Sequence, residues 1–403
     1  MEPAALALAG LIWHGSTEIA TGRAHQGPWE MNESRFEFVD DPTAAIDERG
    51  AISVAWVDQA RKDVFFQRFD ASGKKVGQPV NVSRSPNIFS WLPRIALDPK
   101  GRVFVLWQEI IFSGGSHGGD ILFARSDDRG RSFSEPQNLS SSVAGDGKGR
   151  INKDVWHNGS LDIAVGPDGT VYTAWTEYEG LLWVRRSRDG GRTFSDKLKI
   201  VDTKPARAPA LAAADKTVYL AWTVGDDESA DIRVAKSTDG GASFGAARIV
   251  DKSKGYSDAP KLAVDARGVL HLVYGEGARI LYTRSAEGVS FERPRAISES
   301  GAGFPALALD GKGNLYVLWE RFTDLRSPPR GLALTVSADG GKTFSAPVLV
   351  PESADAGWNG GSQGMLMRKL AVNRDGAIAI VNSSFKENDR SRVWLVRGQL
   401  SRK

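Results

Sequence analysis

Four carboxylates follow an aromatic residue at the same spacing in separate parts of the sequence. Each lies two positions after its aromatic partner, and the pairs are Trp56 and Asp58, Trp107 and Glu109, Trp175 and Glu177, and Tyr274 and Glu276. Carboxylates that share a cleft push one another's pKa values apart, as acid/base catalysis requires. We therefore take these four as candidate catalytic residues. A polar residue at an exposed strand end would give the same pattern, so a structural role for each stays open.

Tyr178 directly follows Glu177 and is a fifth catalytic candidate. A phenol beside a carboxylate could act as a nucleophile or a base. If both residues lie on one strand, however, neighbouring side chains point to opposite faces.

Arginine, histidine and tryptophan residues supply candidate substrate-binding groups. The arginine fork binds a carboxylate through two donors at once, and a tryptophan offers a flat apolar face to a sugar ring. Two long insertions, at 112–120 and 142–160, are expected to be loops that carry binding groups. The candidates are Arg61, Arg94, Arg150, Arg207, Arg321, Arg368, His117, His157, Trp91 and Trp156.

A repeated phrase accounts for the spacing of the first set. "IALDPKGRVFVLWQE" begins at Ile95 and "LALDGKGNLYVLWER" at Leu307, and five weaker relatives occur elsewhere. Each reads as a strand, a turn that contains Asp and Gly, and a second alternating strand. A proline opens the first strand in five units, where a missing N–H is tolerated. These prolines are Pro42, Pro93, Pro209, Pro260 and Pro305.

A second motif, S-x-D-x-G-x-x-F, follows the phrase. It occurs at Ser126–Phe133, Ser187–Phe194, Ser237–Phe244 and Ser337–Phe344. Ser and Asp satisfy local backbone donors, Gly takes a positive φ, and Phe enters the core, so the motif predicts a turn between two strands.

The two motifs together predict an all-β protein: a β-propeller of four-stranded antiparallel blades, seven in number, with six blades and an extra sheet as the alternative. We expect residues 1–33 to be an N-terminal segment and residues 34–403 to form one propeller domain. The segment Ser34–Asp41 is expected to supply the last strand and to latch the ring.

The S-x-D-x-G-x-x-F copies resemble the Asp box, or BNR repeat, and through them the chain resembles the sialidase (neuraminidase) superfamily. The resemblance implies a sialidase-like propeller in which three arginines bind a substrate carboxylate, a tyrosine paired with a glutamate is the nucleophile, and an aspartate is the acid/base. The early F/Y-R-I-P motif of that superfamily is absent, and "WLPRIA" at Trp91–Ala96 has a similar composition in another order.

Composition narrows the classes of partner and cofactor. The net charge of +3 argues against a broad positive surface potential that would attract nucleic acid. The absence of cysteine excludes disulfides and thiolate metal sites. We expect no metal in the site and no cofactor, although residues 146–154 could hold a structural calcium ion. The apolar run Ala4–Ile12 is too short to span a bilayer and looks like the end of an export signal. We expect a monomer that is secreted or periplasmic, with the cytoplasm left open, and that binds an acidic carbohydrate.

Three functions fit these residues. We favour a sialidase-like glycoside hydrolase acting on an acidic glycan. A non-catalytic propeller that binds glycan or protein is the first alternative. A uronate polysaccharide lyase, with a His or Tyr base and an Arg that neutralises the uronate, is the second.

Overall fold

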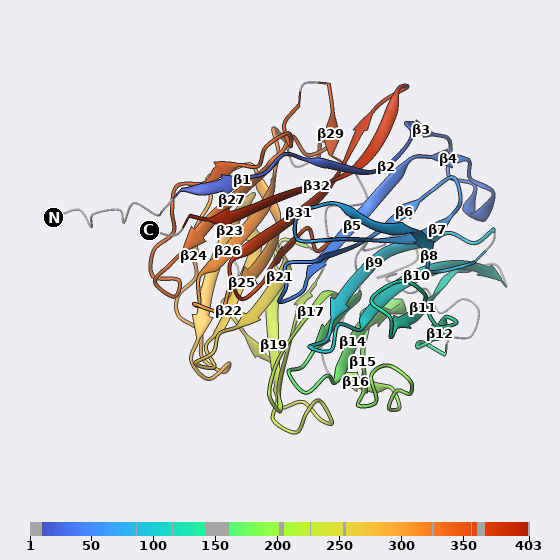
Figure 1. Ribbon diagram of the computed structural model, residues 1–403. Helices are drawn as coiled ribbons and strands as arrows, with labels where there is room; N and C mark the ends of the chain where they lie inside the picture. Colours follow the sequence, from blue (N-terminus) through green and yellow to red (C-terminus); the bar gives the residue numbers. More distant parts are fainter. Residues whose placement is uncertain are drawn as a thin grey trace.

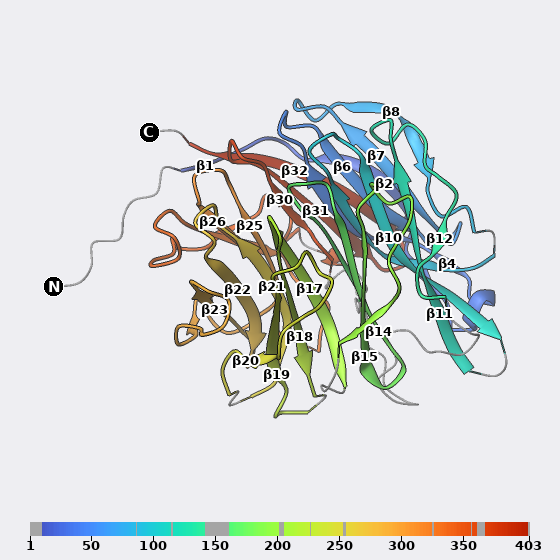
Figure 2. The same ribbon diagram turned by 90° about the horizontal axis from the view of Figure 1, so that it is seen from below.

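The computed structural model describes residues 10–85, 87–113, 116–141, 161–200, 205–225, 227–252, 255–324, 326–355, 357–360 and 367–401. These residues form seven antiparallel sheets that follow one another in chain order around a ring, which Figures 1 and 2 show as a progression of colour. The described residues contain no α-helix, only two short 3-10 turns, η1 (Met31–Glu33) and η2 (Tyr178–Gly180). The predicted seven-bladed, all-β propeller is confirmed. No helix in the described part of the chain is long and apolar enough to cross a membrane.

Six blades are each built from four consecutive strands, with the first strand innermost. Blade 1 contains β5 (Val39–Ile46), β6 (Ile52–Asp58), β7 (Asp63–Phe69) and β8 (Lys75–Asn81). Blade 2 contains β9 (Ser90–Leu97), β10 (Val103–Ser113), β11 (Ser116–Ser126) and β12 (Gln137–Asn138). Blade 3 contains β13 (Leu161–Val165), β14 (Val171–Glu177), β15 (Leu181–Ser187) and β16 (Leu198–Ile200).

The same order holds on the other side of the ring. Blade 4 contains β17 (Ala206–Ala214), β18 (Thr217–Val224), β19 (Asp231–Ser237) and β20 (Arg248–Ile249). Blade 5 contains β21 (Ser257–Val264), β22 (Leu270–Glu276), β23 (Arg279–Ser285) and β24 (Arg295–Ala296). Blade 6 contains β25 (Ala302–Leu309), β26 (Leu315–Arg321), β27 (Leu332–Ser337) and β28 (Val348–Leu349).

Blade 7 joins the two ends of the chain. β29 (Asn359–Gly360) and β30 (Leu370–Val372) pair with β31 (Ala377–Lys386), which pairs with β32 (Arg390–Leu400). The outer edge of β32 is covered by β1 (Leu11–Trp13) and β2 (Thr17–Arg23), so the blue and red strands lie side by side in Figure 1. The ring is therefore closed by residues near the N-terminus, ahead of the domain boundary that we expected at residue 34.

The prediction that Ser34–Asp41 closes the ring was wrong. The end of that segment belongs to β5, the inner strand of blade 1, and β4 (Phe36–Glu37) pairs with β3 (His25–Gln26) instead. Asp41-Pro42 opens β5 with the same backbone irregularity as the other inner strands, which commits this segment to the ring axis. The mostly half-exposed strand β2 suits the outer position better.

The core lies between neighbouring blades. The second strand of each blade is largely buried, and in blades 1 to 6 its repeated aromatic residue packs against the preceding sheet in the ring. Trp107, Trp175 and Trp222 are completely buried in this position. A buried indole N–H needs an acceptor, and this requirement decides the role of the residues that follow.

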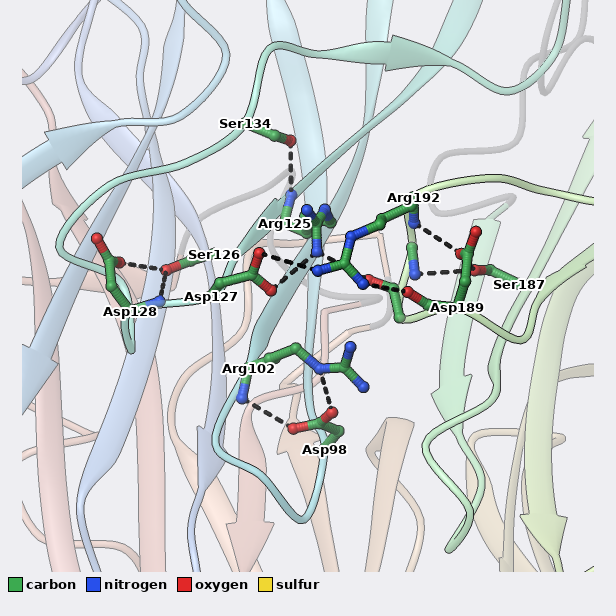
Figure 3. Close-up of polar contacts among 12 residues, drawn as sticks. Asp98, Arg102, Arg125, Ser126, Asp127, Asp128, Ser134, Ser187, Asp189 and Arg192 are labelled. Atoms are coloured by element: carbon green, nitrogen blue, oxygen red, sulfur yellow. Dashed lines mark hydrogen bonds and ion pairs between the residues drawn. The ribbon is translucent and has the colours of Figure 1, made fainter.

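The S-x-D-x-G-x-x-F copies form one recurrent turn. In each, the Ser hydroxyl donates to the Asp carboxylate at 2.7 or 2.8 Å, and the Gly N–H donates to that hydroxyl at 2.7 to 2.9 Å. Figure 3 shows two of these turns, with Arg125 and Arg192 between them. Arg125 donates to Asp127 of its own turn at 2.8 Å and to the Gly190 carbonyl of the next at 3.5 Å.

Each turn also contacts an aromatic ring of the preceding blade. The motif glycine has a positive φ and lies so close to a ring of the preceding blade that a Cβ there would overlap or crowd it. The pairs are Gly130 with Phe66, Gly191 with Phe123, Gly241 with Tyr172, Gly288 with Tyr219, and Gly341 with Tyr282. The motif Phe packs edge-on against the same ring in three blades, with centroid distances of 4.9 to 5.2 Å. We call this contact the blade lock.

We expect the mutation Gly130→Ala to lower the free energy of unfolding by about 3 kcal/mol or more, because the buried Phe66 ring cannot move aside. The control is Gly313→Ala, since Gly313 has a similar φ of +79° and no atom lies within 4 Å of the point that its Cβ would occupy. The control should lose only about 1 kcal/mol, the cost of the positive φ. Urea unfolding curves of the two variants measure the difference, and equal losses would contradict the blade lock.

Candidate functional site

The inner strands begin with a repeated backbone bulge at one end of the ring, which we call the mouth. In five blades the residue before the proline has a positive φ, between 47° and 55°, and the strand pairing shifts there. A bulge of this kind re-aims side chains. The pairs of residues on either side of it are Asp40 and Thr43, Trp91 and Arg94, Arg207 and Ala210, Asp258 and Lys261, and Gly303 and Ala306.

Charged residues meet at the ring axis just inside the mouth. Arg368 donates to Asp162 at 2.7 Å, and Arg94 and Lys261 both interact electrostatically with that carboxylate. Burial lowers the pKa of Lys261 to about 8 and that of Arg94 to about 10, although Asp162 opposes both changes. One of the three cations therefore contacts the Asp162 carboxylate directly, and the other two lie within its electrostatic field. The structure brings together two predicted arginines, Arg94 and Arg368, and adds Lys261, which was missed.

The channel behind this cluster is mostly apolar. A cavity of about 360 Å³ is lined by alanine and larger aliphatic side chains of the inner strands, with Asp162, Lys261 and Arg368 at its polar end. Chemistry on a polar substrate therefore belongs at the mouth and not deeper in the channel.

A buried ionic network joins the last blades to the first. Lys369 donates to Glu320 and to Asn382, the latter at 2.7 Å, and Ser383 donates to Asp40. Burial raises the pKa of Glu320 despite its partner Lys369. Burial and the neighbouring Asp40 raise the pKa of Asp41 well above its usual range. These contacts link the second strands of blades 6 and 7 to the residue before β30 and to the inner strand of blade 1.

A phenol, a carboxylate and a guanidinium meet where blades 4 and 5 adjoin. Arg207 is buried, with 1% of its side chain exposed, and its Nε donates to Asp258 Oδ1 at 3.2 Å. Its guanidinium lies 4.5 Å from the centre of the Tyr256 ring. Tyr256 is 41% exposed, and its hydroxyl lies 3.5 Å from Asp258 Oδ2. The structure therefore presents an exposed phenol beside a carboxylate that is held from behind.

Sequence analysis found Arg207 but missed Tyr256 and Asp258. The sequence did contain a signal for Asp258. It stands two residues before Pro260, in the same way as Arg207 stands two residues before Pro209. Thr223 adds a third donor to Asp258, at 3.0 Å.

The backbone of Tyr178 lies near the group formed by Arg207, Tyr256 and Asp258. It begins η2 and not a strand, and η2 packs against the start of β17, next to Arg207. A Cβ on Gly180 would overlap the backbone of Pro205 and Ala206, so a glycine is needed there.

The four aromatic-linked carboxylates do not form the expected ring of acids. Glu109 accepts the Trp107 indole N–H at 3.2 Å, and Glu177 accepts that of Trp175 at 3.0 Å. Both are buried, and each satisfies the tryptophan of its own blade. Their spacing therefore reflects the need of a buried indole for an acceptor.

The other two carboxylates are also bound within their own blades. Asp58 pairs with Arg61 at 3.6 Å, and burial raises its pKa. Glu276 accepts the Ser257 hydroxyl at 2.8 Å. Because side chains alternate along a strand, Ser257 and Glu276 lie on the opposite face of β21 from Asp258.

The remaining candidates are placed as follows. Arg321 is exposed at the end of β26, and the half-buried Trp91 donates its indole N–H to Gln59 at 2.9 Å. Residues 116–120 extend strand β11 and pair with 109–113, so the expected flexible loop at 112–120 is largely a hairpin, and His117 lies opposite Phe112.

Arg150, Trp156 and His157 lie outside the described residues, as does the segment 146–154 considered for calcium. Among the described residues, no cluster of three or more His, Asp or Glu side chains could hold a metal ion.

We expect Glu109→Gln to keep activity within about twofold of wild type, because glutamine retains the acceptor for Trp107 and the chemistry lies elsewhere. Burial raises the pKa of Glu109 in the folded state, so ionisation of this carboxyl opposes folding as pH rises through that pKa. The variant should therefore gain stability over wild type at pH 7, and the gain should shrink at low pH, where Glu109 is protonated. Thermal unfolding at several pH values measures this difference, and a strong loss of turnover would return Glu109 to the catalytic set.

Comparison with known proteins gives a likeness at the level of structure alone. No family model and no curated protein sequence matches the chain. A polysaccharide lyase of family PL25, an ulvan lyase bound to -[GlcA(1-4)Rha3S]-, superposes with a TM-score of 0.60 at 13% identity, covering 93% of this chain and 94% of the lyase. A Hadza microbial sialidase gives 0.51 at 15% identity, covering 85% and 75%.

A third neighbour acts on a different sugar. The GH93 α-L-arabinofuranosidase of Fusarium graminearum, in complex with arabinobiose, gives a TM-score of 0.51 at 13% identity and covers 76% of this chain and 92% of that enzyme. The neighbours thus include lyases and hydrolases that process carbohydrates, and this chain has the fold that they share.

Proposed function

We propose that this protein is a carbohydrate-active enzyme that cleaves an acidic polysaccharide at the propeller mouth by β-elimination, as a uronate lyase. The observation that carries the proposal is the exposed phenol of Tyr256 beside Asp258 and above Arg207. The polysaccharide enzymes among the structural neighbours support the substrate class.

Elimination needs only the groups that meet at the mouth. Tyr256 takes the proton from C5 of the uronate while its own phenolic proton passes to Asp258. The electron pair of that C–H bond forms the C4–C5 double bond, and the C4–O bond to the neighbouring sugar breaks. The leaving oxygen takes a proton from the phenol of Tyr256, and Asp258 returns its proton to Tyr256. No water is consumed, and the product is an unsaturated uronate.

Positive charge near the phenol favours this step. The carboxylate of the uronate must be neutralised before its α-proton becomes acidic. Arg207 is covered by Tyr256 and held by Asp258 and the Gly225 carbonyl, so it positions the carboxylate of Asp258. Lys261 and Arg368, at the polar end of the axial cavity, are the cations that line open space.

A sialidase-like hydrolase is the second candidate. The proximity of Arg94 and Arg368 favours it, because the resemblance to sialidases implies three arginines on a substrate carboxylate, but the third cation here is Lys261. It also needs a separate acid/base carboxylate. Glu109 and Glu177 are engaged by indoles, and Glu276 faces away from Tyr256, so the described residues fit the lyase better.

We expect Tyr256→Phe to lower turnover by about 10² to 10⁴, the usual contribution of a positioned acid or base, while binding is retained. Wild type and variant are incubated with acidic polysaccharides, including the GlcA(1-4)Rha3S polymer, and the unsaturated product is followed in the ultraviolet. Arg192→Gln, an exposed change in the S-x-D-x-G-x-x-F turn of blade 3 at the other end of the ring, is the control and should leave turnover unchanged.

Three results would overturn the lyase assignment. New reducing ends without ultraviolet absorbance would indicate hydrolysis. Binding without any product would indicate a non-catalytic propeller. Full activity in Tyr256→Phe would remove this phenol from the reaction.

A further inference from the structure

A stack of aromatic rings lies on the mouth face where blades 1 and 2 adjoin. It consists of Trp29, Phe36, Phe89 and Trp91, and we call it the aromatic platform. Ring centroids are 5.3 Å apart for Trp29 and Trp91 and 6.1 Å apart for Trp29 with each phenylalanine. Trp91 is the residue at the inner-strand bulge of blade 2, so the platform starts at the mouth and runs outward.

One ring of the platform is exposed, and the two phenylalanine rings beneath it are buried. Phe36 and Phe89 are buried, whereas Trp29 is 45% exposed. Trp29 therefore presents part of a large apolar surface to solvent while the rings beneath hold its orientation. A rigid exposed indole of this kind is suited to stack on the apolar face of a sugar ring.

Positive charge borders the platform. Lys62 Nζ lies 5.1 Å from the centre of the Phe89 ring and donates to the Asn32 carbonyl. Arg61, the preceding residue, has 67% of its side chain exposed, pairs with Asp58 at 3.6 Å and lies 5.2 Å from the centre of the Phe65 ring. The exposed Arg61 and the platform-bound Lys62 lie in one turn, so this part of the mouth suits a sugar unit that carries a carboxylate or sulfate.

The platform is continuous with a cavity on the same face. Phe36 and Phe89 cluster with Phe38 and Phe385, and these two line a cavity of about 550 Å³ together with Asp40 and His25. A volume of this size lies in the range of ligand sites. The platform therefore lies next to this cavity, with the buried rings of Phe36 and Phe38 between them.

We propose that the aromatic platform is a second sugar-binding subsite, at which Trp29 stacks on one unit of the acidic polysaccharide and Arg61 pairs with its charge. The inference rests on the proposed function for the identity of the polymer. Trp91 belongs to blade 2 and Asp258 to blade 5, three blades away in a ring of seven. A chain that contacts both must lie across the mouth, so the enzyme binds and cuts within long chains.

The test measures affinity for the GlcA(1-4)Rha3S polymer by affinity electrophoresis, with a short oligosaccharide of the same repeat as a soluble competitor. We expect Trp29→Ala to weaken binding of the polymer about tenfold, which corresponds to about 1.4 kcal/mol. Trp29→Phe should recover most of the affinity, because a ring remains. Arg61→Gln should weaken binding about threefold, as suits an exposed charge. The control Ile249→Ala removes a comparably exposed apolar side chain from β20 and should change nothing.

The outcomes separate this inference from the lyase proposal. Weaker polymer binding in Trp29→Ala, with binding of the short competitor unchanged, supports the subsite whether or not any variant shows turnover. Unchanged polymer binding overturns it even if turnover depends on Tyr256. Equal weakening for polymer and competitor also overturns it, because the platform would then be part of the catalytic subsite.

Discussion

The blade lock is the contact on which the rest of the structure depends. A ring from one blade rests against a glycine of the next, and the lack of a Cβ allows the two sheets to approach. Because the contact recurs at five of the seven junctions, from blades 1 and 2 to blades 5 and 6, it fixes the relative orientation of these blades. Pairing of β2 with β32 then closes the ring between residues that are more than 360 positions apart in sequence. Only a closed ring brings the seven inner strands to one axis, and the mouth exists as a consequence.

Within each blade, the inner strand and the second strand have different structural roles. The second strand is buried, and in blades 2 and 3 the carboxylate after its tryptophan accepts the indole N–H. The inner strand begins at the mouth with an X-Pro bulge, in which five non-glycine residues adopt a positive φ. Such a backbone is costly and persists only where the surroundings impose it. Its repetition places variable residues such as Asp40, Arg207 and Asp258 at the mouth on a constant scaffold.

The fold was largely predictable from sequence because its determinants are local. A turn of Ser, Asp and Gly, a proline at the start of a strand and an alternating aromatic strand each carry their own signal over fewer than fifteen residues. Ring closure was not predictable in the same way, since it depends on which of two segments covers β32. Ser34–Asp41 was expected to close the ring and Thr17–Arg23 was expected to lie in an N-terminal segment, whereas packing in three dimensions selects Thr17–Arg23. The site was predicted less well, also for a physical reason. Glu109 and Glu177 have the right chemistry for catalysis, and the sequence does not show that their side chains turn toward an indole. Tyr256 was missed because it lies in a link between blades, outside both repeats, where no spacing singles it out.

The arrangement around Tyr256 constrains how any acidic substrate can bind. Arg207 is the most deeply buried cation at this point, yet Tyr256 covers it and Asp258 holds it, so it cannot reach a sugar carboxylate. In the proposed elimination, its charge holds the Asp258 carboxylate in place, and this carboxylate takes the phenolic proton as Tyr256 accepts the proton of the substrate. The negative charges of the proposed substrate are then met by Lys261 and Arg368, which line the axial cavity, and by the exposed Arg61. Because these lie in different blades, a polymer with charges at regular intervals satisfies them better than a single sugar does.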